Sequence, residues 1–193
     1  ALMREVSLNE PNFAVAMVSP EDGVAQAIAI AKTARRPVVI ADTQDNPGCG
    51  GNADTTGLLR ALGAAGAEGA VLGFLCDADA AKAAHAAGEG AVIDIALGGR
   101  TGPEGVTPFQ GRFTVTKLAP GRFRTTGSVS GGRDVDLGPM ALLTIGVVSV
   151  AVTTKRMQAL DQAPFVHLGV ELFGAVEAAA ALRRKLAGHP GQQ

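Results

Sequence analysis

The residues best suited to chemistry in this 193-residue chain gather in one short stretch, IADTQDNPGCGGNADTTGLL, which spans residues 40–59. Three carboxylates, Asp42, Asp45 and Asp54, stand there with no basic residue between them, and Asn46 adds an amide. Side chains of these types can bind a substrate or orient a reacting group. The stretch follows an apolar run and precedes an expected helix. This order predicts a loop at the carboxyl end of a strand, where open α/β sheets bind ligands.

Glycines are the second feature of this stretch. They permit backbone conformations that are closed to other residues, and they let a ligand approach closely. The helix expected from about residue 54 to residue 65 would also offer unpaired N–H groups to an anion. We therefore take the following residues as candidates for a substrate cleft: Asp42, Asp45, Asn46, Gly48, Gly50, Gly51, Asp54, Thr55 and Thr56.

A purely structural role explains the same residues. Asn-Pro-Gly favours a turn, Asp54 or Thr55 suffices as a helix cap, and Asp42 can tie down its own loop. The clustering of acids and their predicted place beside the crevice favour a function. Lys155 and Arg156, which follow another expected strand, could reach the same region and attract a substrate carboxylate, but solvated charges explain them equally well.

Several named motifs fail on this sequence. A phosphate-binding loop needs Gly-Lys-Ser/Thr, and no lysine lies between residues 33 and 81. The string GCGGNA formally matches a dinucleotide fingerprint with Asp77 as the ribose acid, but its glycines come late after the strand. A calcium loop would have Pro47 where glycine is required. The three histidines and two cysteines show no metal-ligand spacing, so we expect no cofactor or metal in this chain.

Apolar runs alternate with amphipathic stretches in the first half. We expect strands at 37–41, 70–75 and 91–97, and helices at 19–36, 54–65 and 78–87, the first of them capped by Ser19. Such alternation is typical of parallel strands joined by crossovers. The sequence therefore predicts an α/β fold of three layers, with a mostly parallel, mixed sheet in this half.

The second half predicts antiparallel structure. A β-hairpin is expected over residues 111–130 around Pro120-Gly121, followed by two strands within 141–154 that are broken at Gly146. We divide the chain into an N-terminal extension or linker (1–18), an α/β domain (19–171), and a C-terminal helix with a tail (172–193).

Composition excludes some partners. The formal net charge is −1 and the chain has no Trp or Tyr, so nucleic acid is not expected. No apolar run approaches the length of a membrane span, and the N-terminus has no export leader. Two cysteines favour a reducing, cytoplasmic setting. With 47% hydrophobic residues, a homo-oligomer stays possible.

Three strings together resemble the C-terminal domain of the microcystinase C (MlrC) family of zinc metallopeptidases. They are VVIADTQDNPGCGGNADTTGLLRAL, DADAAKAAHAAGEGAVIDIALGG and LGPMALLTIGVVSVAVTTKRMQALDQAPFVHLGVE. The most specific part is Asp-x-x-Asp-Asn-Pro-Gly-x-Gly followed by Asp-x-Thr and Leu-Leu-Arg. The resemblance runs from about Phe13 to Glu171; beyond it the family's Lys-Ser and His-Phe-Arg segment has no counterpart here.

The resemblance implies a function in peptide or amide bond hydrolysis. It places the zinc ligands on an N-terminal domain, which would be a partner of this chain, and gives the loop at 42–56 the role of one wall of the cleft for a peptide or small amide substrate. The isolated chain is then expected to be inactive, because hydrolysis needs the metal-activated water. The alternative is a non-catalytic module that binds a small anion or nucleotide at the glycine-rich loop.

Overall fold

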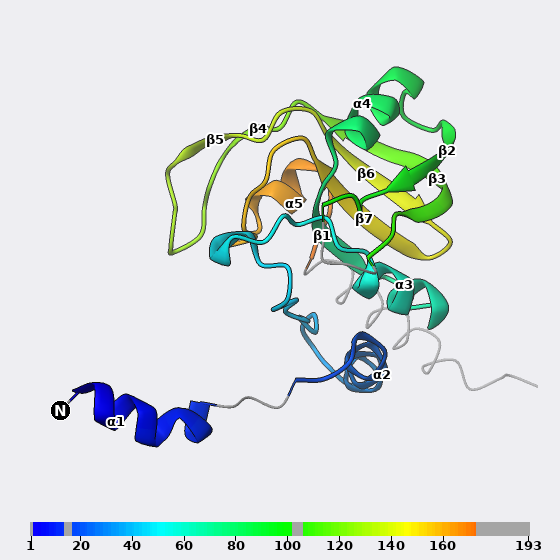
Figure 1. The fold of residues 1–193 in the computed structure, drawn as a ribbon. Coiled ribbons are helices and arrows are strands. Elements are labelled where there is room, and N and C mark those ends of the chain that lie inside the picture. Colours follow the sequence, from blue (N-terminus) through cyan, green and yellow to red (C-terminus); the bar gives the residue numbers. More distant parts are fainter. Residues whose placement is uncertain (1, 14–16, 102–105, 173–193) are drawn as a thin grey trace, which may run out of the picture.

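The computed structural model describes residues 2–13, 17–101 and 106–172, and a five-stranded mixed sheet lies at its centre (Figure 1). The strand order is β1-β7-β6-β3-β2, and β4 and β5 form a separate antiparallel pair. The strands are β1 (Val71–Cys76), β2 (Val92–Leu97), β3 (Phe109–Ala119), β4 (Arg122–Arg124), β5 (Asp134–Asp136), β6 (Met140–Ile145) and β7 (Val148–Thr153). The helices are α1 (Leu2–Asn9), α2 (Pro20–Ala31), α3 (Gly57–Ala64), α4 (Ala78–Ala87) and α5 (Ala163–His167), with short 3-10 turns η1 (Glu10–Phe13) and η2 (Pro47–Cys49).

Both faces of the sheet are covered, which confirms the three-layer α/β class. Successive residues of a strand face opposite sides of a sheet. In β6, Ala141 and Leu143 join the core that contains residues of α3 and α4. Met140 and Leu142 join a second core, against which Phe165 of α5 packs. Burial on both faces explains why the central strands read as continuous apolar runs.

The parallel pairing expected for successive strands of the first half is wrong. Among the strands of the described ranges, only β1 and β7 pair in parallel, whereas the β2–β3, β3–β6 and β6–β7 pairs are antiparallel. Helix α4 therefore connects the two edge strands of the sheet rather than two neighbours. The strands between β1 and β2 come from the second half of the chain. Of these, β6 and β7 have the most completely buried side chains.

The strand predicted at residues 37–41 is also wrong. The segment belongs to no strand, and none of the strands in the described ranges pairs with it. Val39 is 86% exposed, while Ile40 packs partly against the core. A β-branched sequence indicates a fit to a pleated, half-buried surface, and a strand forms only where such a surface is supplied.

The turn predicted at Pro120-Gly121 is present, but the two strands that flank it do not pair with each other as a hairpin requires. Strands β3 and β4 flank these residues, yet β3 pairs with β2 and β6, and β4 pairs with β5. Gly121 has φ +75°, and a side chain there would collide with the backbone of Gly138, so the chain turns sharply out of the large sheet. The two strands predicted on either side of Gly146 are confirmed as β6 and β7.

The helix start predicted at Ser19 is confirmed. Ser19 caps α2 by accepting a 3.1 Å hydrogen bond from the Asp22 amide, and Asp77 caps α4. Helix α2 ends at Ala31, earlier than predicted. The predicted C-terminal helix and tail fall almost wholly outside the described residues. In the described part of the chain no helix has the length and apolar character needed to cross a membrane.

Candidate functional site

Three segments meet where the parallel strands β1 and β7 end. The first is the acidic loop, which we define as residues 42–56; the others are residues 98–101 after β2 and residues 154–158 after β7. The Cys76 amide at the end of β1 donates to the Ala53 carbonyl at 2.6 Å, and the Gly99 amide donates to the Asp54 carbonyl at 2.6 Å. Carboxyl ends of parallel strands are the usual place for a ligand crevice.

Asp45 organises the acidic loop from within. Its carboxylate accepts three successive backbone N–H bonds, from Ala53 at 2.8 Å, Asp54 at 2.7 Å and Thr55 at 2.8 Å. Partial burial raises the pKa of Asp45, but these donors together outweigh it, so the pKa lies below its ordinary value of 3.8. The carboxylate therefore occupies the cluster of amides that a bound anion would otherwise use.

The other residues at the start of the loop also serve its own backbone. Asp42 is exposed and accepts from the Gln44 and Asp45 amides at 3.0 and 3.3 Å. Asn46 caps η2 by accepting from the Gly48 amide at 2.9 Å. These contacts are the turn-forming role that the sequence left open as the alternative.

The three candidate glycines differ in what surrounds them. A side chain at Gly48 would collide with Gln158, and one at Gly51 would lie 2.6 Å from the Asp45 carbonyl carbon. Gly50 has open space around it and φ +94°. Gly48 and Gly51 therefore allow close packing of the chain on itself, and Gly50 allows the left-handed turn at the end of η2.

Asp54 connects the acidic loop to residues 98–101 instead of capping α3. It is 4% exposed, and its Oδ2 accepts from the Arg100 and Thr101 amides at 3.0 and 2.8 Å. Its Oδ1 is buried without a partner among the described residues. Thr56 is the N-cap residue of α3 but makes no side-chain cap; its hydroxyl donates to the Thr107 carbonyl at 2.8 Å. The expectation that Asp54 or Thr55 caps this helix is therefore wrong.

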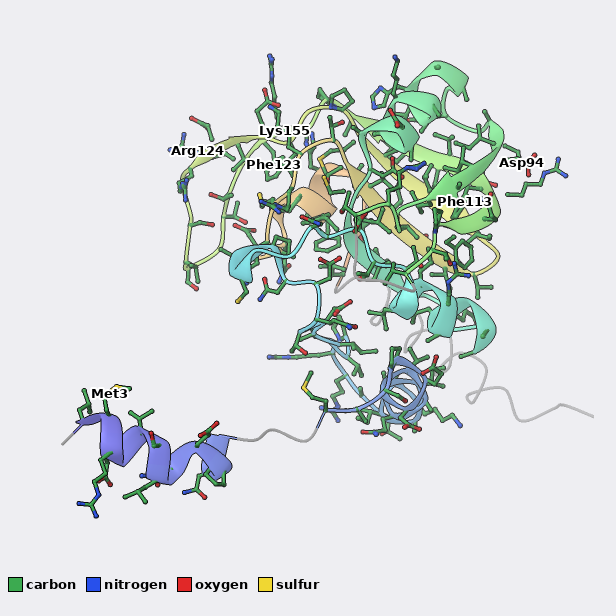
Figure 2. The ribbon with its side chains drawn as sticks, in the orientation of Figure 1. Met3, Asp94, Phe113, Phe123, Arg124 and Lys155 are labelled. Carbon is green, nitrogen blue, oxygen red and sulfur yellow. The ribbon has the colours of Figure 1, made fainter. Side chains whose placement is uncertain are left out.

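The side chains of the two basic candidates, Lys155 and Arg156, contact different parts of the chain. Arg156 Nη1 donates to the Gly51 carbonyl at 3.0 Å and to Asn52 Oδ1 at 3.1 Å, so this side chain lies on the acidic loop. Lys155 Nζ contacts Asp136 of β5, at 3.1 Å from its carbonyl and 3.3 Å from its Oδ1. In Figure 2, Lys155 lies on the same side of the molecule as Phe123 and Arg124 of β4.

Arg100, Asp77 and Cys76 also lie in this region. The sequence considered Asp77 only as the ribose acid of a rejected dinucleotide motif and did not single out the other two. Asp77 follows β1 and accepts from the Gly98 amide at 2.9 Å, which holds the residues after the two edge strands together. The guanidinium of Arg100, 42% exposed, lies 3.8 Å from the Asp77 carboxylate. Burial raises the pKa of the Cys76 thiol above its usual 9.0. Gly-Gly-Arg directly after an apolar run was the available signal.

Two open hollows lie beside β4, and no residue of the acidic loop lines either of them. One, of about 490 Å³, is shallow and lined by β4 and β5. The other, of about 260 Å³, lies between β4 and α5 and includes His167. The His167 ring is centred 5.3 Å from the Phe123 ring, and its Nε2 is buried with no partner in the described part of the chain.

The described residues do not fit a metal on their own. Residues 2–13, 17–101 and 106–172 contain no group of three or more His, Cys, Asp or Glu side chains placed to hold a metal ion. The carboxylates of Asp45 and Asp54 are already engaged by backbone amides. We therefore derive no metal-dependent step from the side chains of this chain.

Fold and site together define an α/β domain whose polar loops meet at the carboxyl ends of one parallel strand pair. A family model described as MlrC C-terminus matches residues 40–176, which is more than half of the chain. The chain belongs to this family, which confirms the resemblance seen in the sequence.

Two longer proteins are similar to this chain. Microcystinase C from Sphingomonas sp. is 31% identical over 153 residues, which cover 79% of this chain and 29% of that protein. A crystal structure of a "putative metallopeptidase" from Mesorhizobium sp. BNC1 is 30% identical with a TM-score of 0.76, and the match covers 87% of this chain and 33% of that chain. The chain thus spans roughly a third of the length of these relatives.

Proposed function

We propose that this chain is the C-terminal domain of an MlrC-like zinc metallopeptidase and forms one wall of the cleft in which a peptide or small amide is hydrolysed. Family membership and the names of the two relatives support a metallopeptidase. In this proposal the zinc ligands belong to an N-terminal domain, and this chain contributes binding and orientation of the substrate.

The observation that carries the proposal is the position of Arg156. Its side chain is exposed, comes from the end of β7, and is held over the acidic loop by two hydrogen bonds. A guanidinium fixed in this way can bind a substrate carboxylate or carbonyl with defined geometry. Arg100 lies on the neighbouring segment and is anchored through Nη2 to the Ala96 carbonyl at 2.8 Å. The two cations mark the surface that we assign to the cleft.

The alternative, a non-catalytic anion or nucleotide module, has less support. It requires free backbone amides at the glycine-rich loop. The amides of Ala53, Asp54 and Thr55 are taken by Asp45, and the Gly48 amide is taken by Asn46. A nucleotide would have to displace a carboxylate from three hydrogen bonds.

A chimera tests the proposed function. Residues 1–193 replace the matching part of Sphingomonas microcystinase C, and hydrolysis of a linear peptide is measured with zinc present. We expect the folded, zinc-loaded chimera to hydrolyse the peptide and this chain alone to be inactive, since the metal supplies the activated water. Stoichiometric, tightly bound zinc in the isolated chain would contradict the placement of the ligands.

Two matched variants of the chimera test whether Arg156 contributes to the proposed wall of the substrate cleft. Arg156→Gln removes the cation over the acidic loop, whereas Lys155→Gln removes the neighbouring cation that faces Asp136. We expect kcat/KM to fall about tenfold for Arg156→Gln, the loss of about 1.4 kcal/mol of charge-assisted binding, and to stay within about twofold for Lys155→Gln. Equal effects of the two changes would show that Arg156 has no particular place in the cleft.

A further inference from the structure

Helix α1 is amphipathic but buries none of its eight residues. Leu2 and Met3 are 77% and 76% exposed, and Leu8 is 65% exposed. Figure 1 shows the helix standing apart from the sheet, and Figure 2 shows Met3 on it, far from the core. A helix this short is marginal in water, and in proteins most helix stability comes from packing an apolar face. Helix α1 therefore needs a surface that the described residues do not supply.

Exposed apolar side chains concentrate in the same part of the chain. Of the exposed large apolar residues in the described ranges, eight lie before residue 40 and five after it. Helix α2 buries Val24, and its neighbour is α3, but Ile30 near the end of α2 is 55% exposed. We define the N-terminal apolar surface as the exposed side chains of Leu2, Met3, Leu8, Met17, Ile30 and Val39. Singly exposed apolar side chains are ordinary, so it is their number in one short part of the chain that favours an interaction there.

The charges of α1 fit a protein partner better than a lipid surface. Helices that lie on membranes carry Lys and Arg along their polar face. The sequence of α1, LMREVSLN, contains one arginine and one glutamate, which are adjacent. The helix thus offers no net positive charge to anionic lipid.

The comparison structure bears on what could cover this surface through the extent of its match. Its match covers 87% of this chain, which is more residues than follow position 39, so it includes part of the N-terminal segment. The matched chain is about three times as long as the matched region. At least part of this segment therefore has a counterpart in a protein that has much more chain to place against it.

We propose that the N-terminal apolar surface docks on the remaining, zinc-bearing part of an MlrC-like metallopeptidase and so holds the acidic loop at the cleft. This inference rests on the proposed function. The occupant is an apolar face of that part, and α1 becomes stably helical only when it is docked. Residues 2–13 and 17–39 are then a docking element, which overlaps the linker predicted at residues 1–18.

Amide hydrogen exchange tests the docking. The isolated chain is compared with two chimeras, in which it replaces the matching part of Sphingomonas microcystinase C or of the Mesorhizobium protein. We expect the amides of α1 to exchange nearly unprotected in the isolated chain and at least about tenfold more slowly in a folded chimera. Met3→Ser with Leu8→Ser should abolish the gain. Val129→Ser, a change at an exposed valine outside the surface, should leave it intact.

The outcomes separate this inference from the proposed function. A zinc-loaded chimera that hydrolyses peptide while α1 stays unprotected overturns the docking and keeps the function. Protection without hydrolysis keeps the docking and overturns the function. Strong protection in the isolated chain also overturns the docking: if it depends on concentration, a second copy covers the surface, and otherwise the chain covers itself. If neither chimera folds cooperatively, each host's N-terminal part is added in trans, and unchanged exchange of α1 then overturns the docking.

Discussion

Replacing Asp45 by asparagine tests whether the acidic loop is built around one carboxylate. Oδ2 of Asp45 accepts from two amides, those of Asp54 and Thr55, and Oδ1 accepts from Ala53. An amide group keeps one acceptor oxygen, so at least one N–H loses its partner and faces another donor. A hydrogen bond to a charged group is worth about 1.5–3 kcal/mol, and the two remaining bonds weaken when they become neutral. Because the site is half-buried, we expect Asp45→Asn to destabilise the fold by about 2–3 kcal/mol.

Urea unfolding followed by circular dichroism measures this loss. With a slope of about 2 kcal/mol per molar, the midpoint should fall by about 1 M or slightly more. Asp42→Asn is the matched control, since Asp42 is exposed and its two bonds, at 3.0 and 3.3 Å, are local. We expect that change to cost about 0.5 kcal/mol. The reasoning is refuted if both variants lower the midpoint equally.

The pH dependence gives the same test a second readout. The pKa of Asp45 in the folded chain lies below 3.8, its ordinary value, so the carboxylate stabilises the fold fully above that value. The contribution is lost as the pH falls through the lowered pKa. We therefore expect the stabilities of the wild type and Asp45→Asn to differ at neutral pH and to converge in acid, below pH 3.8. A gap that stays constant down to about pH 2 would contradict the assignment.

Three further predictions concern other parts of the fold. Gly98→Ala should destabilise the fold by more than about 1 kcal/mol, because φ is +59° and the added carbon would lie 2.5 Å from a carbonyl oxygen of the acidic loop. Gly63→Ala, inside α3 with open space around it, should stabilise the fold by roughly 0.5–1 kcal/mol. The midpoint of thermal unfolding should therefore fall for the first variant and rise for the second. Asp161→Asn should accelerate hydrogen exchange at the two β4–β5 loop amides that this carboxylate accepts from, and unchanged rates there would show that the loop is held by other contacts. At pH 8 a disulfide reagent should label the exposed Cys49 at least about tenfold faster than Cys76, whose thiol pKa is raised by burial, and equal rates would contradict that burial.

Elements that depend on local sequence could be predicted well. Helix α4 and the pair β6–β7 lie within a residue of where periodicity and turn residues place them. The cap at Ser19 follows from the chemistry of helix ends, whereas the cap at Asp77 was not predicted. Each of these signals needs only residues close together in the chain, so one sequence contains the necessary information.

Strand pairing could not be predicted because it depends on distant residues. The run at 37–41 has the composition of a buried strand, but no described strand pairs with it. The turn at Pro120-Gly121 is real, yet β4 pairs with β5, ten or more residues further on, instead of returning along β3. An apolar alternating pattern specifies which face a residue prefers and leaves open which strand lies next to it.

A substrate site at the candidate residues stays a prediction, and the structure adds where each of them lies. The loop was expected to follow a strand at residues 37–41, which belong to no strand; it lies instead against the end of β1, and Arg156 contacts it from the segment after β7. Lys155, adjacent in sequence, faces β5 because successive side chains leave the strand end in different directions. Arg100 and Asp77 enter the site through contacts between residues more than twenty positions apart, which no local pattern encodes. The cleft itself, its substrate and a cytoplasmic location stay predictions.

In this region the acidic side chains stabilise the loop, and a basic side chain is the group that we propose to contact the substrate. Three carboxylates without a neighbouring base indicate a negative surface, but Asp45 and Asp54 direct their oxygens at backbone amides, and of the three only Asp42 is exposed. Carboxylates that accept several backbone hydrogen bonds make a loop rigid, and a rigid loop holds in place any side chain that is hydrogen-bonded to it. The side chain bonded to this loop is the guanidinium of Arg156. The acids therefore serve the proposed cleft indirectly, by holding in place a group of the opposite charge, and Asp45→Asn in the active chimera should weaken substrate binding in the same direction as Arg156→Gln.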